Sequence, residues 1–194
     1  MSRHSVSTAV LASLALALGG AQAQSQSHAQ AQLRTLELDG APVQYQLRVL
    51  EPQPLASPEE KILPLDSPVN TARLIARHLA AGDIEEAALL SNSPKRRFEV
   101  LTDYREAVGE AAFKDVYAQY FDPRNPLVAE IAIGPHRVLA WRLGGRGNLT
   151  AQYYVEVDGR FLLDDVPSVE RARLRRVFDA YRSGREALEP RNAP

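Results

Sequence analysis

Cysteine is absent from the 194-residue sequence, which excludes disulfides, thiolate nucleophiles and cysteine-ligated metal sites. Lysine is scarce as well: only three of the 23 basic residues are lysine, a bias that indicates a GC-rich bacterial genome. The formal net charge is −1, so the composition gives no support for a large nucleic-acid-binding surface. We therefore expect no nucleic-acid partner.

Long hydrophobic runs are missing too, and the main apolar stretch lies near the N-terminus. Val10–Leu18 spans nine residues, whereas a membrane-spanning helix needs roughly 20. Arg3 precedes this stretch, and Ala21 and Ala23 match the small-residue pattern of a cleavage site. We expect residues 1–23 to be a signal peptide; an uncleaved anchor or a buried helix is the alternative. The mature protein would be periplasmic or secreted, with no transmembrane anchor.

The rest of the chain has the composition of an ordinary globular domain, with 45% apolar and 24% charged residues. Asp39-Gly40 lies between two alternating stretches, which is a hairpin signal, and five prolines between Glu51 and Pro68 favour an extended connector. We expect a disordered stretch at 24–32, a β-hairpin at 33–50, a proline-rich linker at 51–67, one domain at 68–188 and a tail at 189–194.

Within that domain, helical patterns come first and strand patterns follow. Ser67 is placed to cap a first helix, and apolar side chains repeat at helical spacing as far as Tyr120. After Pro126 the apolar period changes to two, and Ser168 then precedes a last amphipathic helix. Segregated helices and strands predict an α+β fold, with helices packed on one face of an antiparallel sheet.

The segment Ala72–Ser93 joins an amphipathic helix, a Gly82-Asp83 break and a second helix. Together with the aromatic helix and strands that follow, it resembles the nuclear transport factor 2-like (cystatin-like cone) superfamily over about residues 67–167. The N-terminal hairpin and the helix after Ser168 lie outside that resemblance. It implies a curved, cone-like sheet with a cone-shaped cavity that binds small apolar ligands, hosts acid–base chemistry or is packed shut.

Large side chains on the concave face of such a sheet would line or fill the cavity. The candidates for this lining are Leu139, Trp141, Leu143, Tyr153 and Val155.

Carboxylates near phenols are the weak candidates for catalysis. Glu130 or Asp164 could serve as a base, with Tyr104 or Tyr153 as the hydrogen-bond donor. The alternatives carry no chemistry: Glu130 faces solvent on an alternating strand, and Asp164-Asp165 forms a turn, with adjacent side chains on opposite faces.

Arginines gather in two places that could contact a partner. Arg96 and Arg97 lie in the first turn of a helix, and Arg171, Arg175 and Arg176 lie on the last helix. A salt-bridged solvent face is the alternative explanation.

No two histidines have the spacing of metal ligands, and phosphate-loop and nucleophile-elbow motifs are missing. We therefore expect neither a metal nor a cofactor. The leading hypothesis is an exported, non-catalytic binding protein of the bacterial cell envelope, with an envelope protein as partner. One alternative is a carrier or sensor of small apolar ligands, and another is an isomerase or dehydratase in the same cavity. The sequence leaves the oligomeric state open.

Overall fold

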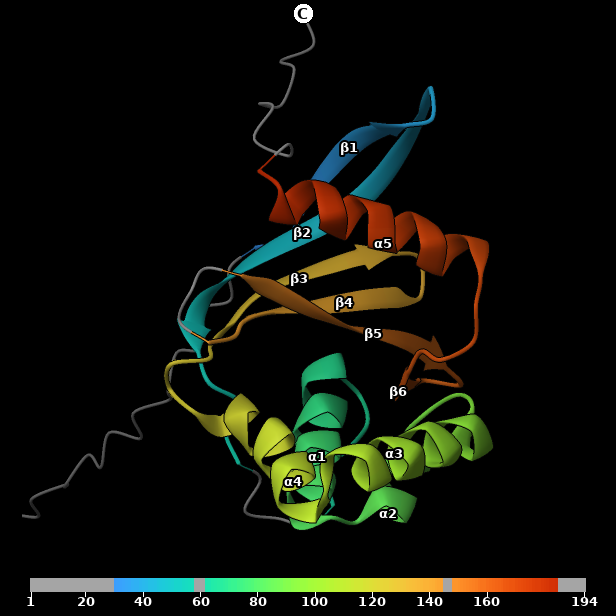
Figure 1. Cartoon of the computed structure of the whole chain (residues 1–194). Helices are drawn as coiled ribbons and strands as arrows, with labels where there is room; N and C mark the ends of the chain where they lie inside the picture. The colour runs from blue at the N-terminus through green and yellow to red at the C-terminus, as the bar shows by residue number, and fades with distance from the viewer. Residues whose placement is uncertain (1–29, 58–61, 145–147, 185–194) are drawn as a thin grey trace, which may run out of the picture.

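The computed structural model of the chain describes residues 30–57, 62–144 and 148–184 (Figure 1). The predicted signal peptide at 1–23, most of the polar stretch at 24–32 and the tail at 189–194 lie outside these residues. Among the described helices, none combines the length and the apolar character that crossing a membrane requires.

The described elements confirm the α+β class. The strands are β1 (Gln32–Leu38), β2 (Ala41–Gln53), β3 (Leu127–Ile133), β4 (His136–Arg142), β5 (Leu149–Val157) and β6 (Arg160–Leu163). The helices are α1 (Pro68–Ala81), α2 (Ile84–Ala88), α3 (Pro94–Val108), α4 (Glu110–Ala118), the 3₁₀ turn η1 (Gln119–Phe121) and α5 (Val169–Arg182).

The described strands form one antiparallel sheet in the order β1-β2-β3-β4-β5-β6. The N-terminal hairpin has the predicted turn at Asp39-Gly40, but it belongs to the main sheet because β2 pairs with β3. Tyr45 and Leu47 of β2 are buried there. The predicted linker also begins inside the fold, since β2 runs to Gln53 and the Leu55 N–H donates to the carbonyl of Tyr120 at 3.1 Å.

Helices cover both faces of the sheet, not one face as the sequence pattern predicted. Figure 1 shows α1–α4 gathered on one side and α5 lying across the other. Leu174, Val177 and Phe178 of α5 pack on Ile131 and Val138. Two-sided coverage explains why nearly every residue of β3 is buried.

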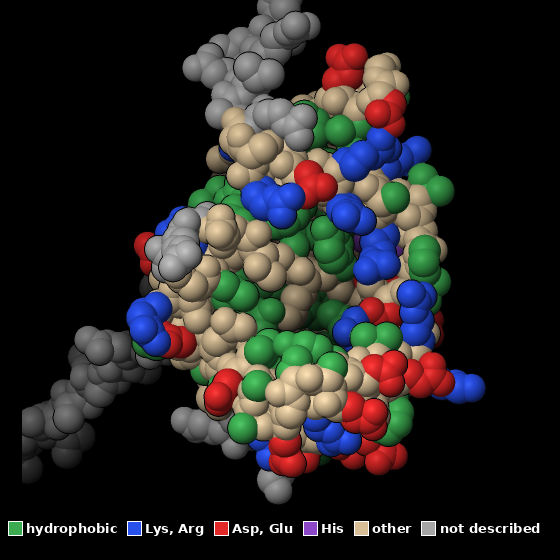
Figure 2. All heavy atoms as spheres, in the orientation of Figure 1, with side chains coloured by type: hydrophobic (Ala, Val, Ile, Leu, Met, Phe, Trp, Pro, Cys, Tyr) green, Lys and Arg blue, Asp and Glu red, His purple; other side chains and the backbone are tan. Residues whose placement is uncertain are grey.

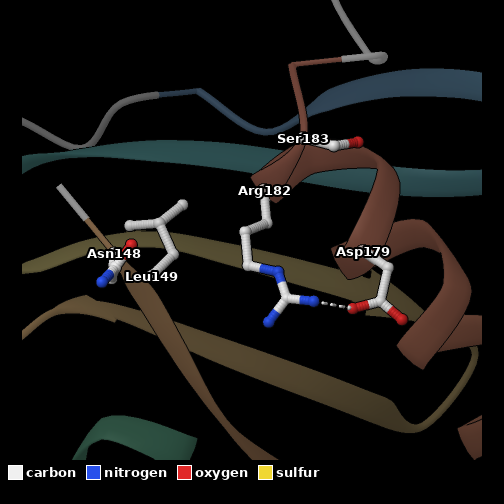
Figure 3. A pocket seen from close by; sticks show the side chains of 5 residues that line it. All are labelled: Asn148, Leu149, Asp179, Arg182 and Ser183. Atoms are coloured by element: carbon white, nitrogen blue, oxygen red, sulfur yellow. Dashed lines mark hydrogen bonds and ion pairs between the residues drawn. The ribbon is translucent and has the colours of Figure 1, made fainter.

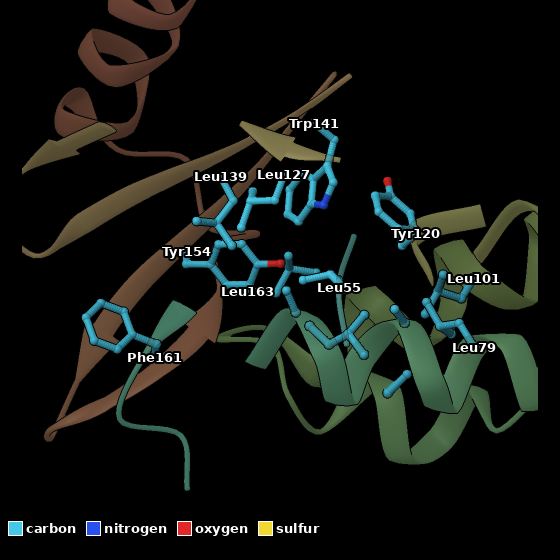
Figure 4. Packing of buried hydrophobic residues seen from close by; sticks show 14 of the residues in the cluster. Leu55, Leu79, Leu101, Tyr120, Leu127, Leu139, Trp141, Tyr154, Phe161 and Leu163 are labelled. Atoms are coloured by element: carbon cyan, nitrogen blue, oxygen red, sulfur yellow. The ribbon is translucent and has the colours of Figure 1, made fainter. Parts of the chain in front are cut away.

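The larger core lies between the sheet and the α1–α4 layer (Figure 4). Trp141 and Tyr154 project from the sheet, and Leu79 and Leu101 project from the helices. The Tyr120 ring meets the Trp141 ring edge-on, with centroids 5.3 Å apart. This packing fixes η1 and the adjoining end of α4 against the sheet.

Local signals set the ends of two helices as the sequence predicted. The Ser67 hydroxyl accepts the Asn70 N–H at 3.2 Å, and the Ser168 hydroxyl accepts the Arg171 N–H at 3.0 Å. Gly82 ends α1 with φ at 91°, a conformation that favours glycine. A Cβ at that position would lie 2.7 Å from Cε of Lys114, so the end of this α4 side chain lies against the Gly82 backbone.

Replacing Leu174 with alanine tests whether α5 is an integral layer of the fold. Leu174 is 0% exposed, so the Leu174→Ala variant should lose about 2–5 kcal/mol of unfolding free energy in urea denaturation. Val169, on the same helix, is 62% exposed, and Val169→Ala should change stability by less than about 0.5 kcal/mol. Equal effects of the two substitutions would contradict the described packing of α5.

Candidate functional site

Strand β5 is paired along only part of its outer edge. Strand β6 pairs with Tyr154 through Val157, and it leaves β5 from Leu149 to Tyr153 without a strand neighbour among the described residues on that side. The carbonyl of Tyr153 accepts the Asp164 N–H at 2.8 Å, where the chain turns away. The sheet therefore has an open edge of about five residues.

A cleft of about 450 Å³ lies along this open edge, between the two helical layers. We call it the edge cleft; Figure 2 shows the surface hollowed between α5 and the α3–α4 layer. Its lining comprises Ile75, Leu79, Ala87, Arg97, Leu101, Tyr104, Val116, Tyr117, Tyr120, Ala151, Gln152, Tyr153, Leu163, Asp164, Asp165 and Arg171.

Aromatic rings form the wall of the edge cleft that α3, α4 and η1 contribute. Phe113 is fully buried, and its ring centroid lies 5.9 Å from that of Tyr104 and 5.0 Å from that of Tyr117. Burial raises the pKa of Tyr117 to about 12, against the opposing influence of the Arg97 charge. Burial likewise raises the pKa of Tyr120. These phenols remain neutral hydrogen-bonding groups at physiological pH.

Asp165 closes one end of the edge cleft by joining α3 to the end of β6. Its carboxylate accepts the Arg97 Nε–H at 2.7 Å and a second Arg97 N–H, and it also accepts the Ser91 hydroxyl at 2.7 Å. The Asp165 N–H donates to Oδ1 of Asn92 at 2.8 Å. Both carboxylate oxygens are therefore engaged in structural bonds.

Asp164 is buried and has a different set of partners. One of its oxygens accepts the Asn92 amide at 2.9 Å, and the other lies 2.9 Å from Nδ1 of His136 on β4. The two neighbouring carboxylates thus point to different partners, as the predicted alternation of adjacent side chains requires. His136 begins β4 and is buried.

Comparison of the chain with known protein families, curated proteins and solved structures finds no match. The resemblance to the nuclear transport factor 2-like superfamily therefore stays a prediction.

Glu130 does not line the edge cleft, and it does not face solvent as the strand pattern predicted. It is 9% exposed, forms an ion pair with Arg48 of β2, and lies 3.7 Å from Nε of Arg137 on β4. Two features explain the difference: a register shift between Leu127 and Ala129 breaks the simple alternation, and the sheet is buried on both faces.

Of the five predicted cavity residues, only Tyr153 lines the edge cleft. Leu139 and Trp141 are fully buried in the core, where they fill space and do not border an open cavity. Leu143 packs partly against the same core, and Val155 is buried further along β5, beyond the open edge. Side-chain size alone could not distinguish residues that fill a core from residues that line an opening.

The sequence did not identify Tyr117 and Tyr120 as lining residues, because their helical spacing is equally typical of residues that face a buried core. Tyr117 and Tyr120 lie on successive turns, and only the position of β5 shows that they border an opening. Tyr104 and Asp164, weak catalytic candidates, both line the edge cleft. One sequence signal was available: β6 has four residues and β5 has nine, so part of β5 had to lack a partner.

The arginine candidates separate into paired and unpaired side chains. Arg97 is held by Asp165, and Arg176 forms an ion pair with Asp39 on the hairpin turn. Arg171 lies over the Tyr153 ring, with its guanidinium carbon 5.5 Å from the centroid, and no carboxylate among the described residues pairs with it. Arg96 and Arg175 are exposed and likewise have no ion pair within residues 30–57, 62–144 and 148–184.

A second hollow lies farther along the same edge, where β5 begins (Figure 3). Asn148 and Leu149 line it from the strand, and Asp179, Arg182 and Ser183 line it from α5. Arg182 donates to Asp179 across 2.9 Å. Both hollows therefore border the unpaired part of β5, one near each of its ends.

Alkaline titration of Tyr117 tests the described burial of the cleft wall. Its pKa rises from 10.0 to about 12 in the folded chain, so folding favours the neutral phenol. That stabilisation is complete below pH 10 and is lost as the pH rises from 10 to about 12. The Tyr117→Phe variant should therefore lose less stability than the wild type over this interval.

Absorbance at the phenolate band provides the accompanying readout. The variant should lack one phenol that ionises near pH 12 and should retain the full signal near pH 10. A variant that instead loses absorbance change near pH 10 would show that Tyr117 is solvated and that the described wall is wrong.

Proposed function

We propose that this chain is a non-catalytic binding protein and that the edge cleft is its binding site. The main support is the combination of an open cleft of about 450 Å³ with the absence of an available acid–base pair in its described wall. Asp164 is engaged by Asn92 and His136, and Asp165 is engaged by Arg97 and Ser91. His136, the titratable partner of Asp164, is not among the residues that line the edge cleft, so this pair is not placed to exchange a proton with a molecule bound there.

The cleft offers groups suited to recognition. The hydroxyls of Tyr104 and Tyr117 take no hydrogen bond from the described residues, and Arg171 has no carboxylate partner among them. Tyrosine and arginine side chains contribute strongly at binding sites because they combine apolar area with directed hydrogen bonds. These groups favour binding of a partner over turnover of a substrate.

A carrier of small apolar ligands is the second candidate function. Leu79, Leu101 and Tyr120 make the α1–α4 side of the edge cleft apolar. The volume of the cleft also falls within the roughly 300–1,000 Å³ typical of small-molecule pockets. The isomerase or dehydratase hypothesis has less support, because Glu130 lies outside the cleft and is paired with Arg48.

The proposal includes export to the periplasm or the medium, supported by the sequence of residues 1–23. Expression of the full chain in a bacterial host, followed by N-terminal sequencing of the exported form, should give Gln24 as the first residue. Replacing Ala23 with a bulky residue such as tyrosine should block this processing. Retention of Met1 on the wild-type protein would contradict the predicted cleavage.

Cross-linking from inside the cleft tests the binding function. A photoreactive phenylalanine analogue replaces Tyr117 in the cleft, and in a matched control it replaces Glu85 on the exposed side of α2. Illumination in the producing cells should yield adducts from position 117 and none from position 85. Intact-mass analysis separates the two candidates, because a carried ligand adds a small mass and a protein partner adds a large one. Equal adduct yields at both positions, or no adducts, would refute the edge cleft as the binding site.

A further inference from the structure

The open edge of β5 presents backbone groups in position for another strand. Because the carbonyl of Tyr153 accepts from Asp164, the N–H and C=O of Tyr153 point away from β4. Antiparallel geometry places the same groups of Ala151 and Leu149 on that outer edge as well. The chain itself makes one bond along this edge, at Tyr153, and then leaves for α5.

This edge lacks the features that normally prevent strand addition. Natural sheet edges are protected by charged side chains, prolines, bulges or a covering element. The exposed stretch of β5 reads Leu-Thr-Ala-Gln-Tyr from Leu149 to Tyr153, with no charge and no proline. The pairing of β4 with β5 is continuous in register over this stretch, so no bulge turns the edge away. Hollows border it near both ends (Figures 2 and 3).

The wall of this edge formed by α5 is basic. Arg171 lies over Tyr153, and the charges of Arg171, Arg175 and Arg182 all act on the Tyr153 phenol. Asp179 is the acidic group that opposes them there; because it is bound to Arg182, those two charges offset one another, and Arg171 and Arg175 remain as the basic groups. Asp164 and Asp165 lie at one end of the edge cleft, but His136, Asn92 and Arg97 occupy their oxygens. The side of the edge toward α5 therefore favours negative charge.

We propose that the open edge of β5 binds an extended acidic peptide segment, which adds to the sheet as a further strand in line with β6. This inference rests on the proposed binding function and names the class of partner. Successive side chains of a strand point to opposite faces, so one row of the peptide meets the α5 arginines and the other meets the tyrosine wall. The segment recognised is one in which acidic and apolar residues alternate.

Charge also argues against a second copy of this chain as the occupant. Pairing of two β5 edges about a twofold axis would bring the α5 arginines of both copies alongside the same joined sheet. Arg171 and Arg175 have no ion-pair partner among the described residues, so the two basic walls would repel one another. An acidic peptide segment would instead be attracted electrostatically to Arg171 and Arg175.

Defined synthetic probes test the charge requirement with the purified full chain. The probe is a decapeptide of alternating glutamate and valine, and the comparison peptide has lysine in place of glutamate. Fluorescence anisotropy of labelled peptides should show binding of the acidic probe at least about tenfold tighter than the basic one at low salt. Equal affinity for the two peptides, or no binding of the acidic peptide, would overturn the proposal.

Backbone methylation tests whether the peptide binds as a strand. Only alternate N–H groups of an added strand face the edge, so N-methylation of one alternate set should abolish binding and methylation of the other set should be tolerated. Equal tolerance of both methylated peptides would overturn strand addition.

A matched pair of variants locates the contact. Arg171→Glu should weaken binding of the acidic probe at least about tenfold, whereas Arg173→Glu, an equal charge change at an exposed position of the same helix turn, should leave it nearly unchanged. Equal losses in the two variants would show a diffuse charge effect and overturn the assignment of the site.

Two further outcomes separate this inference from the proposed function. Adducts from position 117 without binding of the acidic probe would leave the cleft as a binding site and overturn the peptide. Sedimentation of the chain as a dimer that the acidic probe fails to dissociate would show that a second copy covers the edge, and it would also overturn the peptide.

Discussion

The bonds made by Asp164 and Asp165 determine where the sheet ends, and the edge cleft depends on that ending. Leu163 pairs on its outer side with the segment before α3, donating to the carbonyl of Leu90 at 2.8 Å and accepting the Asn92 N–H at 3.0 Å. Asp165 then holds Arg97, so the chain is fixed to the helical layer directly after β6. Strand β6 stops after four residues as a result, and Leu149 to Tyr153 of β5 have no strand neighbour on the side away from β4 among the described residues.

The same junction explains why the opening persists in a well-packed fold. Phe113 and Trp141 are fully buried on the side of the sheet that α1–α4 cover, and Leu174 and Val177 are fully buried on the side that α5 covers. These two cores hold the layers apart at a fixed spacing, and the short β6 leaves no strand of the described residues between them along Leu149 to Tyr153 of β5. An opening produced by topology in this way needs no strained backbone or missing side chain to maintain it.

Local patterns predicted the fold class because each element carries its own signal. Ser67 and Ser168 cap helices, Asp39-Gly40 turns the hairpin, and the change of apolar period after Pro126 marks the start of the strands. Long-range pairing has no such signal, so the membership of β2 in the main sheet could not be predicted. Glu130 shows the same limit, because its burial depends on Arg48, which lies 82 residues away in sequence.

The candidate site was harder to predict than the fold because it is assembled from elements that are distant in sequence. Tyr104, Tyr117, Gln152 and Arg171 come from four different elements, and none of their local patterns distinguishes an opening from a core. Of the two carboxylates that the sequence suggested for chemistry, Asp164 carries structural bonds in the wall, and Glu130 lies outside the cleft, paired with Arg48. In the described residues, the two carboxylates of the cleft therefore hold the wall together, and the phenols, the Arg171 guanidinium and the open backbone of β5 are the groups that the proposed partner would contact.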